Sequence, residues 1–287
     1  MVKKIGVAVD STADFPEGFA EKFDLNVIPV HVIVDGVDYL DGITIANNEI
    51  INFMKMGCDL ATRAPAPATY ADHFEKLLKK YDYIISFHVS SELSDCYVSA
   101  KSALRLLSDK DMQRVKLVDT KNISIGQALY AFKSINVMKD TRSVANLEAK
   151  LDELMESSLN SFTVDSLKWL KKSGRIGAAG AMLGNMLNIK PIISVQNAKL
   201  ALIGKVRGKR AALDEMARSA GKVQKRFGGN YDVWVGHCDA IEDAGYLKEK
   251  LASALNMDMQ SISLVEAGAS VAVKVGPGSC NWGMVRK

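Results

Sequence analysis

YIISFHV-SSELS-DCYVSAKSALRLL-SDKDMQR-VKLVD, residues 83–119, is the stretch that decides the fold class. Tyr83–Val89 is an almost continuous apolar run, which is typical of a strand buried on both faces of a parallel sheet. A helix is expected from about Ser94 to Leu107, and Val115–Asp119 predicts the next strand. Two strands separated by a helix of ten or more residues predict a βαβ unit and therefore a parallel sheet.

The residues on either side of this unit continue the alternation of strands and helices. Strands are expected at Ile5–Val9 and Val27–Val34, and Asp35-Gly36 predicts the turn of a short hairpin. Pro16 and Pro67 suit the first turns of helices. Three more helices are expected to start near residues 47, 123 and 144. The first half of the chain is therefore predicted to be an α/β domain.

The pattern changes after residue 157. A short strand and a short helix are expected first, followed by a Gly/Ala-rich helix over residues 177–187. Ile192–Val195 and Leu200–Val206 predict a hairpin. We group the apolar segment Val271–Val275, which leads to the turn Gly276-Pro277-Gly278, with these strands. This half is predicted to be α+β with antiparallel pairing. The expected domains are residues 1–160 and 161–287.

Composition excludes several classes of protein. No run of 18 apolar residues is present, so no membrane-spanning helix is expected. The formal net charge of +4 is too small to indicate nucleic-acid binding. The cysteines are scattered and form no C-x-x-C pair, which argues against disulfides and a zinc site and favours a cytoplasmic location. No glycine-rich nucleotide loop and no G-x-S-x-G elbow occur, and no metal or cofactor is expected.

Two segments that precede helices have the chemistry to bind an anion. Ser90-Ser91-Glu92-Leu93-Ser94 follows the buried strand, where a helix N-terminus offers free N–H groups and hydroxyls. Thr62-Arg63-Ala64-Pro65-Ala66-Pro67 is stiffened by two prolines and presents a hydroxyl and a guanidinium. Taken alone, the serine segment is equally consistent with plain helix capping, and a segment such as residues 62–67 is more often only a connector.

Two basic groups could dock an acidic protein or a phosphate, although solvated surface charge is the commoner explanation of such runs. They consist of Lys168, Lys171, Lys172 and Arg175, and of Lys205, Arg207, Lys209 and Arg210.

Taken together, seven short motifs in order along the chain resemble the DegV family. They are Asp10-Ser11-Thr12-Ala13-Asp14-Phe15-Pro16, Tyr39-Leu40-Asp41-Gly42, residues 62–67, Ser90-Ser91-Glu92-Leu93-Ser94-Asp95-Cys96-Tyr97, Leu170-Lys171-Lys172-Ser173-Gly174-Arg175-Ile176, Ile189-Lys190-Pro191-Ile192 and Val275-Gly276-Pro277-Gly278. Each motif is weak by itself, but the ordered set covers residues 10–278.

The resemblance implies two α/β domains with a long-chain fatty acid in an apolar tunnel between or within them. It also implies that Thr62 and Ser94 hold the carboxylate and that Arg175 lies near an exit or docking surface. The expected partners are the fatty acid and a separate fatty-acid kinase, which forms an acyl-phosphate for phospholipid synthesis. Transient membrane contact fits this role. On this interpretation the chain is a carrier and performs no chemistry itself.

The sequence departs from the family pattern at three places. Arg63 replaces a serine, Asp95-Cys96 replaces Gly-Thr, and Lys274 stands where the family has a histidine. An exposed lysine stays charged at neutral pH. The two added cations are therefore expected either to meet the carboxylate directly or to pair with Asp95.

Two other functions stay open at this point. A serine-dependent acyl hydrolase or transferase would use Ser94, although no histidine is clearly placed as its base. A regulatory module that binds a small phosphate would use the basic surface instead. The depth of the cavity and the identity of any bound lipid discriminate among the three.

Overall fold

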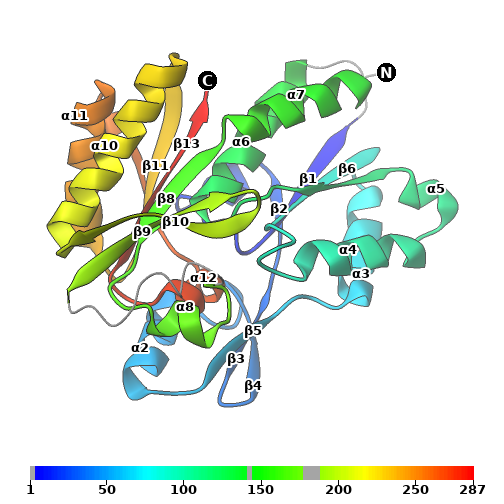
Figure 1. The fold of residues 1–287 in the computed structure, drawn as a ribbon. Coiled ribbons are helices and arrows are strands. Elements are labelled where there is room, and N and C mark those ends of the chain that lie inside the picture. Colours follow the sequence, from blue (N-terminus) through cyan, green and yellow to red (C-terminus); the bar gives the residue numbers. More distant parts are fainter. Residues whose placement is uncertain (1–3, 141–143, 177–187) are drawn as a thin grey trace.

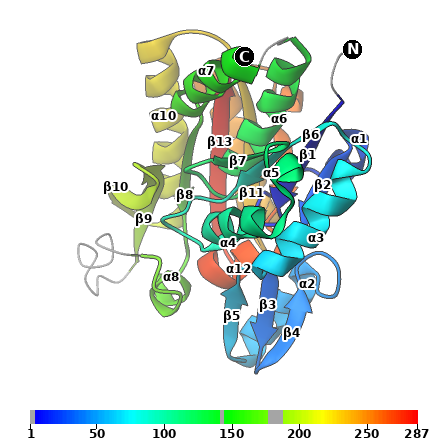
Figure 2. The same cartoon turned by 90° about the vertical axis from the view of Figure 1, so that its right-hand side faces the viewer.

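The computed structural model describes residues 4–140, 144–176 and 188–287 of the chain. The helix expected over residues 177–187 lies outside these residues. The fold contains three sheets, with helices packed on and between them (Figures 1 and 2).

The N-terminal sheet is parallel, with strand order β2-β1-β6-β7, so the predicted βαβ organisation is confirmed. Its strands are β1 (Ile5–Asp10), β2 (Leu25–Ile28), β6 (Tyr83–His88) and β7 (Val115–Asp119). The intervening helices are α1 (Phe19–Lys22), α3 (Pro67–Leu78), α4 (Cys96–Ala103), a 3₁₀ turn (Leu104–Leu106) and α5 (Asp109–Met112). Pro67 is the first residue of α3, as expected from its fixed φ.

A small antiparallel sheet of order β4-β3-β5 lies beneath the N-terminal sheet in Figure 1. It contains β3 (His31–Val34), β4 (Val37–Leu40) and β5 (Leu60–Arg63), with α2 (Asn47–Met56) beside it. The hairpin at Asp35-Gly36 is confirmed, since both residues have positive φ. The single strand predicted at Val27–Val34 is wrong. The chain leaves β2 at Pro29, which has no N–H to donate, and enters a different sheet.

The third sheet is mixed, with order β10-β9-β8-β13-β11-β12, and all its neighbours are antiparallel except β11 and β12. Its strands are β8 (Leu159–Thr163), β9 (Ile189–Gln196), β10 (Lys199–Arg207), β11 (Tyr231–Cys238), β12 (Ser263–Glu266) and β13 (Ser279–Arg286). The long helices α10 (Lys209–Phe227) and α11 (Ile241–Leu255) cover its outer face (Figure 1). A 3₁₀ turn (Met259–Ser261) precedes β12. The predicted hairpin is β9–β10.

Two short helices lie between the mixed sheet and the small sheet: α8 (Lys168–Lys172) and α12 (Ala269–Val275) (Figure 1). Our grouping of Val271–Val275 with the strands is therefore wrong. An apolar run that is buried on every side has the same composition in a strand and in a helix, so the pattern alone could not distinguish them.

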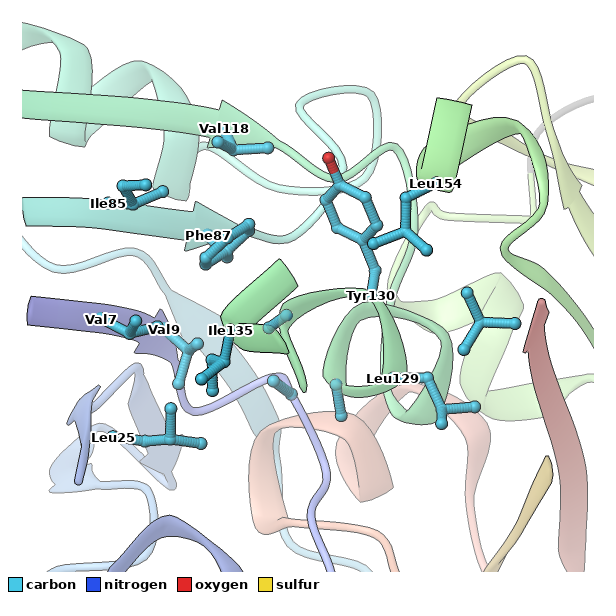
Figure 3. Close-up of a cluster of buried hydrophobic side chains, with 14 of the residues drawn as sticks. Val7, Val9, Leu25, Ile85, Phe87, Val118, Leu129, Tyr130, Ile135 and Leu154 are labelled. Atoms are coloured by element: carbon cyan, nitrogen blue, oxygen red, sulfur yellow. The ribbon is translucent and has the colours of Figure 1, made fainter. Parts of the chain in front are cut away.

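The largest buried cluster joins the two large sheets through α6 (Ile125–Asp140) (Figure 3). Val9 and Phe87 reach α6 from the parallel sheet, whereas Trp234 and Val285 belong to the mixed sheet. Helix α7 (Val144–Glu156) adds Leu151 and Leu154. The division of the chain into domains at residue 160 stays a prediction, because this cluster is common to both halves.

No helix of the described residues is both long and apolar enough to cross a membrane.

Candidate functional site

A cavity of about 410 Å³ lies between the N-terminal elements and the mixed sheet, and its wall is mostly apolar. All six residues singled out from the sequence line it: Thr62, Arg63, Ser94, Asp95, Arg175 and Lys274. Apolar side chains supply much of the remaining wall, among them Val30, Val89, Leu93, Phe162, Leu170 and Val271. Pockets for small organic ligands typically measure about 300–1,000 Å³. The cavity is therefore large enough for an organic ligand and combines an apolar body with a few polar groups.

Thr62 and Arg63 reach the cavity from the end of β5. The sequence predicted a loop here, but Thr62 pairs with Val32 and Arg63 with His31 in the small sheet. The hydroxyl of Thr62 makes no hydrogen bond in the described part of the chain, so it is available to a ligand. Arg63 instead forms an ion pair with Asp38 of β4, and the expected alternative of a pair with Asp95 is wrong.

The loop that contains Ser94 is tied to both halves of the molecule. Ser90 donates a hydrogen bond to the carbonyl of Ala198 in the β9–β10 turn at 2.6 Å, and Ser91 donates to Asp119 at 2.6 Å. The hydroxyl of Ser94 donates to Cys96 Sγ at 3.2 Å. Asp95, rather than Ser94, occupies the N-cap position of α4 and is exposed. Ser94 is therefore not the N-cap residue, although its hydroxyl oxygen accepts the N–H of Cys96 at 3.4 Å, and its hydroxyl hydrogen has only a weak sulfur acceptor.

If the cavity holds a fatty acid, as the family resemblance of the sequence implies, Ser94→Ala is expected to weaken binding of palmitate by roughly 1–3 kcal/mol, because the carboxylate would lose one donor. Folding should change little, since Ser94 is not the helix cap. Ser91→Ala is the matched control, because Ser91 belongs to the same loop but contacts Asp119. Isothermal titration of both variants checks this expectation. Equal affinities for wild type and Ser94→Ala would remove Ser94 from the ligand site.

Two cations face the cavity without an acidic partner. Arg175 donates its Nε hydrogen to the carbonyl of Leu93 at 2.7 Å, which leaves its terminal nitrogens unengaged within the described residues. Lys274 is half-buried on the last turn of α12, and its Nζ has no hydrogen bond or ion pair in the described structure. Burial, with a smaller contribution from the positive charge of Arg175, lowers the pKa of Lys274 to about 8. The alternative in which Lys274 pairs with Asp95 is not found among the described residues.

Helix α12, which carries Lys274, is held at its start by two buried carboxylates from the N-terminal half. Asp14 accepts the N–H of Gly268 at 2.8 Å, and Asp41 accepts the N–H of Ala269 at 3.0 Å. Ser11 donates to Asp41 at 2.8 Å, and Ser124 donates to Asp14. The first two sequence motifs thus position the helix that presents Lys274.

The buried carboxylate of Asp14 predicts a measurable pH effect on stability. Burial raises its pKa from 3.8 to about 7, so the folded state binds a proton that the unfolded state releases between these values. The stability contributed by Asp14 is complete below about pH 4 and is lost as the pH rises through about 7. The free energy of unfolding, measured in urea titrations, should fall with pH in wild type but not in Asp14→Asn. We therefore expect the difference between the variant and wild type to change by a few kcal/mol in favour of the variant between pH 4 and pH 8. A constant difference across this range would contradict the raised pKa.

Sequence reasoning missed a polar part of the cavity wall. Asn160 on β8 and Asn281 on β13 line the cavity, and Asn281 donates a hydrogen bond to Ser124 at 3.1 Å. His237 on β11 also lines it, and burial lowers its pKa. These residues come from strands that meet only in the tertiary fold, so no local motif marks them.

Comparison with known proteins shows which family and which solved structures this chain is similar to. The model of a family described as "uncharacterised protein, DegV family" matches residues 4–287. A DegV domain-containing protein of Deinococcus radiodurans is 29% identical over 276 residues, which is 96% of each chain.

Two solved structures are similar over nearly the whole fold. A fatty-acid-binding DegV protein from Thermus thermophilus has a TM-score of 0.90 and 26% identity, covering 99% of this chain and 100% of its own. A stearic-acid-binding protein from Eubacterium ventriosum has a TM-score of 0.90 and 27% identity, covering 99% and 98%. With a family model that matches essentially from end to end, the chain belongs to the DegV family.

Proposed function

We propose that this protein binds a long-chain fatty acid, with the acyl chain in the cavity and the carboxylate near Thr62, Ser94 and Lys274. The observation that carries the proposal is the cavity itself, whose wall is mostly apolar and which presents two cations that have no acidic partner among the described residues. The fatty acids bound by the similar structures support the same ligand class.

The energetics favour such a ligand. Burying about 15 methylenes contributes roughly 12 kcal/mol before the costs of ordering and association are subtracted. A carboxylate placed in the same cavity is costly unless donors or a cation meet it. Thr62, Ser94 and Lys274 supply two hydroxyls and one ammonium for that purpose.

Native mass spectrometry of freshly purified protein, followed by lipid extraction, tests the proposal. We expect one fatty acid per chain, released unchanged when the protein is denatured. Protein purified without lipid that also fails to bind added palmitate would overturn the proposal. A small phosphate compound in place of lipid would favour the regulatory module instead.

The carrier is further proposed to present the carboxylate to a partner fatty-acid kinase in the cytoplasm, which makes acyl-phosphate for phospholipid synthesis. Arg175 supports this step because it is exposed and lines the cavity at the same time. Lys171, which is exposed, extends the positive charge from Arg175 over the adjoining helix, as an acidic docking partner would require. All four cysteines are unbridged, as suits a reducing compartment.

Arg175→Ala is expected to slow acyl-phosphate formation with the kinase more than it weakens palmitate binding. The exposed guanidinium is available to a docked protein, whereas a half-buried lysine remains for the ligand. Kinase assays at saturating palmitate separate the two effects. Equal losses of transfer and of binding would assign Arg175 to the lipid site alone.

The serine-dependent hydrolase has less support. Ser94 donates to a sulfur atom, and among the described residues no histidine lies within hydrogen-bond distance of its hydroxyl. His88, the histidine nearest in sequence, is fully buried and bonded to Asp10 at 3.0 Å. Turnover of an acyl ester that disappears in Ser94→Ala would reverse this order of preference.

A further inference from the structure

Lys274 is placed like a reactive amine rather than a surface lysine. Its helix packs on α2, α8, β3 and β5, and its side chain lines a cavity whose wall includes Leu170 and Val271. Within the part of the chain that the structure describes, its Nζ has neither an ion-pair partner nor a hydrogen bond. A primary amine that is desolvated in an apolar site, or that lies beside another cation, is activated as a nucleophile. Arg175 is such a neighbouring cation.

The acids around α12 are engaged by other groups and do not hold Lys274 in its charged form. Asp14 and Asp41 accept backbone N–H groups at the opposite end of the helix. The elements packed against α12, and the loop that leads into β5, carry the following pairs: His31 and Arg63 with Asp38, Lys55 with Asp239, Lys172 with Asp59, and Glu49 with the N–H of Ala46. Lys168 lies over the Trp169 ring, and Lys171 is exposed. On the cavity wall, Asp95 makes no ion pair with Lys274, and His237 carries no negative charge.

These surroundings raise the uncharged fraction of Lys274. With a pKa of about 8, about half of the side chain is neutral at pH 8, compared with less than about one part in a hundred for an exposed lysine. A bound carboxylate would reverse this, because its negative charge favours the ammonium. Lys274 is therefore an ion-pair partner for a fatty acid and a free amine for an uncharged ligand of the same shape.

The geometry points to a second activity of this cavity: Lys274 captures long-chain aldehydes as a reversible Schiff base. This inference rests on the proposed function, since the alkyl chain would use the same apolar wall. The amine at the polar part of the cavity would meet the aldehyde carbon where the carboxylate carbon of a fatty acid would lie.

The reaction balances without a further reactant. The lone pair of Nζ attacks the aldehyde carbon, a C–N bond forms, and the carbonyl electrons move to oxygen, which takes a proton. The resulting carbinolamine loses its hydroxyl and the remaining N–H proton as water, which leaves a C=N bond between the chain and Lys274. No atom is oxidised or reduced, and addition of water reverses both steps.

Other groups on the cavity wall favour the capture. The hydroxyls of Thr62 and Ser94 line the same cavity and can donate to the carbinolamine oxygen. Arg175 disfavours the protonated imine, which is the form that water attacks most readily, because the two would be positive charges in one site. The apolar wall limits the access of water to the C=N bond.

The test uses hexadecanal with the delipidated full-length protein and sodium borohydride, which reduces the C=N bond to a stable amine. We expect one hexadecyl group per chain by intact mass, located on Lys274 by peptide mapping. Early labelling should rise about fivefold between pH 7 and pH 8, in step with the neutral fraction of Lys274. Palmitate should block it, because its carboxylate protonates the amine and its chain occupies the cavity.

Two variants make the result specific. Lys274→Arg keeps the positive charge but cannot form an imine, so it should lose the adduct. Lys171→Arg removes an exposed lysine nearby and should label like wild type. Labelling spread over surface lysines and unaffected by Lys274→Arg would overturn the inference.

The same experiment separates this inference from the proposed function. Palmitate binding without any adduct at Lys274 would refute aldehyde capture and leave the fatty-acid carrier standing. Failure of both palmitate and hexadecanal to bind would refute the carrier as well.

Discussion

Lys274→Met is expected to weaken palmitate binding by roughly 10- to 100-fold, the usual range for loss of a hydrogen-bonded charge partner. Hexadecanol should bind to the variant about as well as to wild type, because an alcohol brings no charge for the ammonium to compensate. Titration calorimetry with both ligands checks this difference. Lys199→Met is the matched control, since Lys199 is exposed and pairs with Glu92 outside the cavity wall.

The same lysine is expected to set the pH dependence of the proposed fatty-acid binding. The free protein has a Lys274 pKa of about 8, and a bound carboxylate raises it, so binding takes up a proton above pH 8. Affinity for palmitate should be nearly constant from pH 6 to 7.5 and fall about fivefold between pH 8 and 9. Lys274→Met should abolish the fall. Equal losses for acid and alcohol, or a flat profile to pH 9, would show that Lys274 only packs against the chain.

The second large effect is expected at the glycine that follows α12. Gly276 has φ of 75° and ψ of 167°, a region that is essentially limited to glycine, and a Cβ there would overlap the ring of Trp169. Trp169 is buried, so the ring has little room to move away. Gly276→Ala is therefore expected to lower the free energy of unfolding by roughly 3–5 kcal/mol, measured by urea denaturation.

Gly174→Ala provides the control for backbone strain without overlap. Gly174 has φ of 70°, but a Cβ there meets nothing within 4 Å. Gly174→Ala should lower the free energy of unfolding by about 1–2 kcal/mol, as for a single non-glycine residue forced into the left-handed region. Similar losses for the two variants would mean that contact with Trp169 contributes little.

Much of the fold could be predicted because local chemistry is decisive in several segments. The apolar strand at residues 83–89 required burial on both faces, and burial of this kind occurs in parallel sheets with helices on each side. The turn at Asp35-Gly36 selected its hairpin through two positive φ angles. The ordered motifs also led to the family, and with it to the six residues that the structure places around one cavity.

Other features depended on contacts between distant residues. Local sequence could not separate β2 from β3, because the change of sheet at Pro29 depends on which strands are already paired. The segment 271–275 lies in a helix whose N-cap Gly268 and first residue Ala269 donate their N–H groups to Asp14 and Asp41, more than 200 residues earlier in the chain. Arg63 pairs with Asp38 because the hairpin brings that carboxylate beside it.

The sequence by itself determined the family, the parallel sheet and the chemical character of the site, since these depend on residue types and their order. Only the tertiary structure decided the pKa of Lys274. An isolated lysine is charged at neutral pH, whereas here burial in the cavity wall and the nearby guanidinium of Arg175 lower its pKa to about 8. Both influences arise from groups that meet only on folding, because desolvation and charge repulsion depend on distance in space rather than on position along the chain.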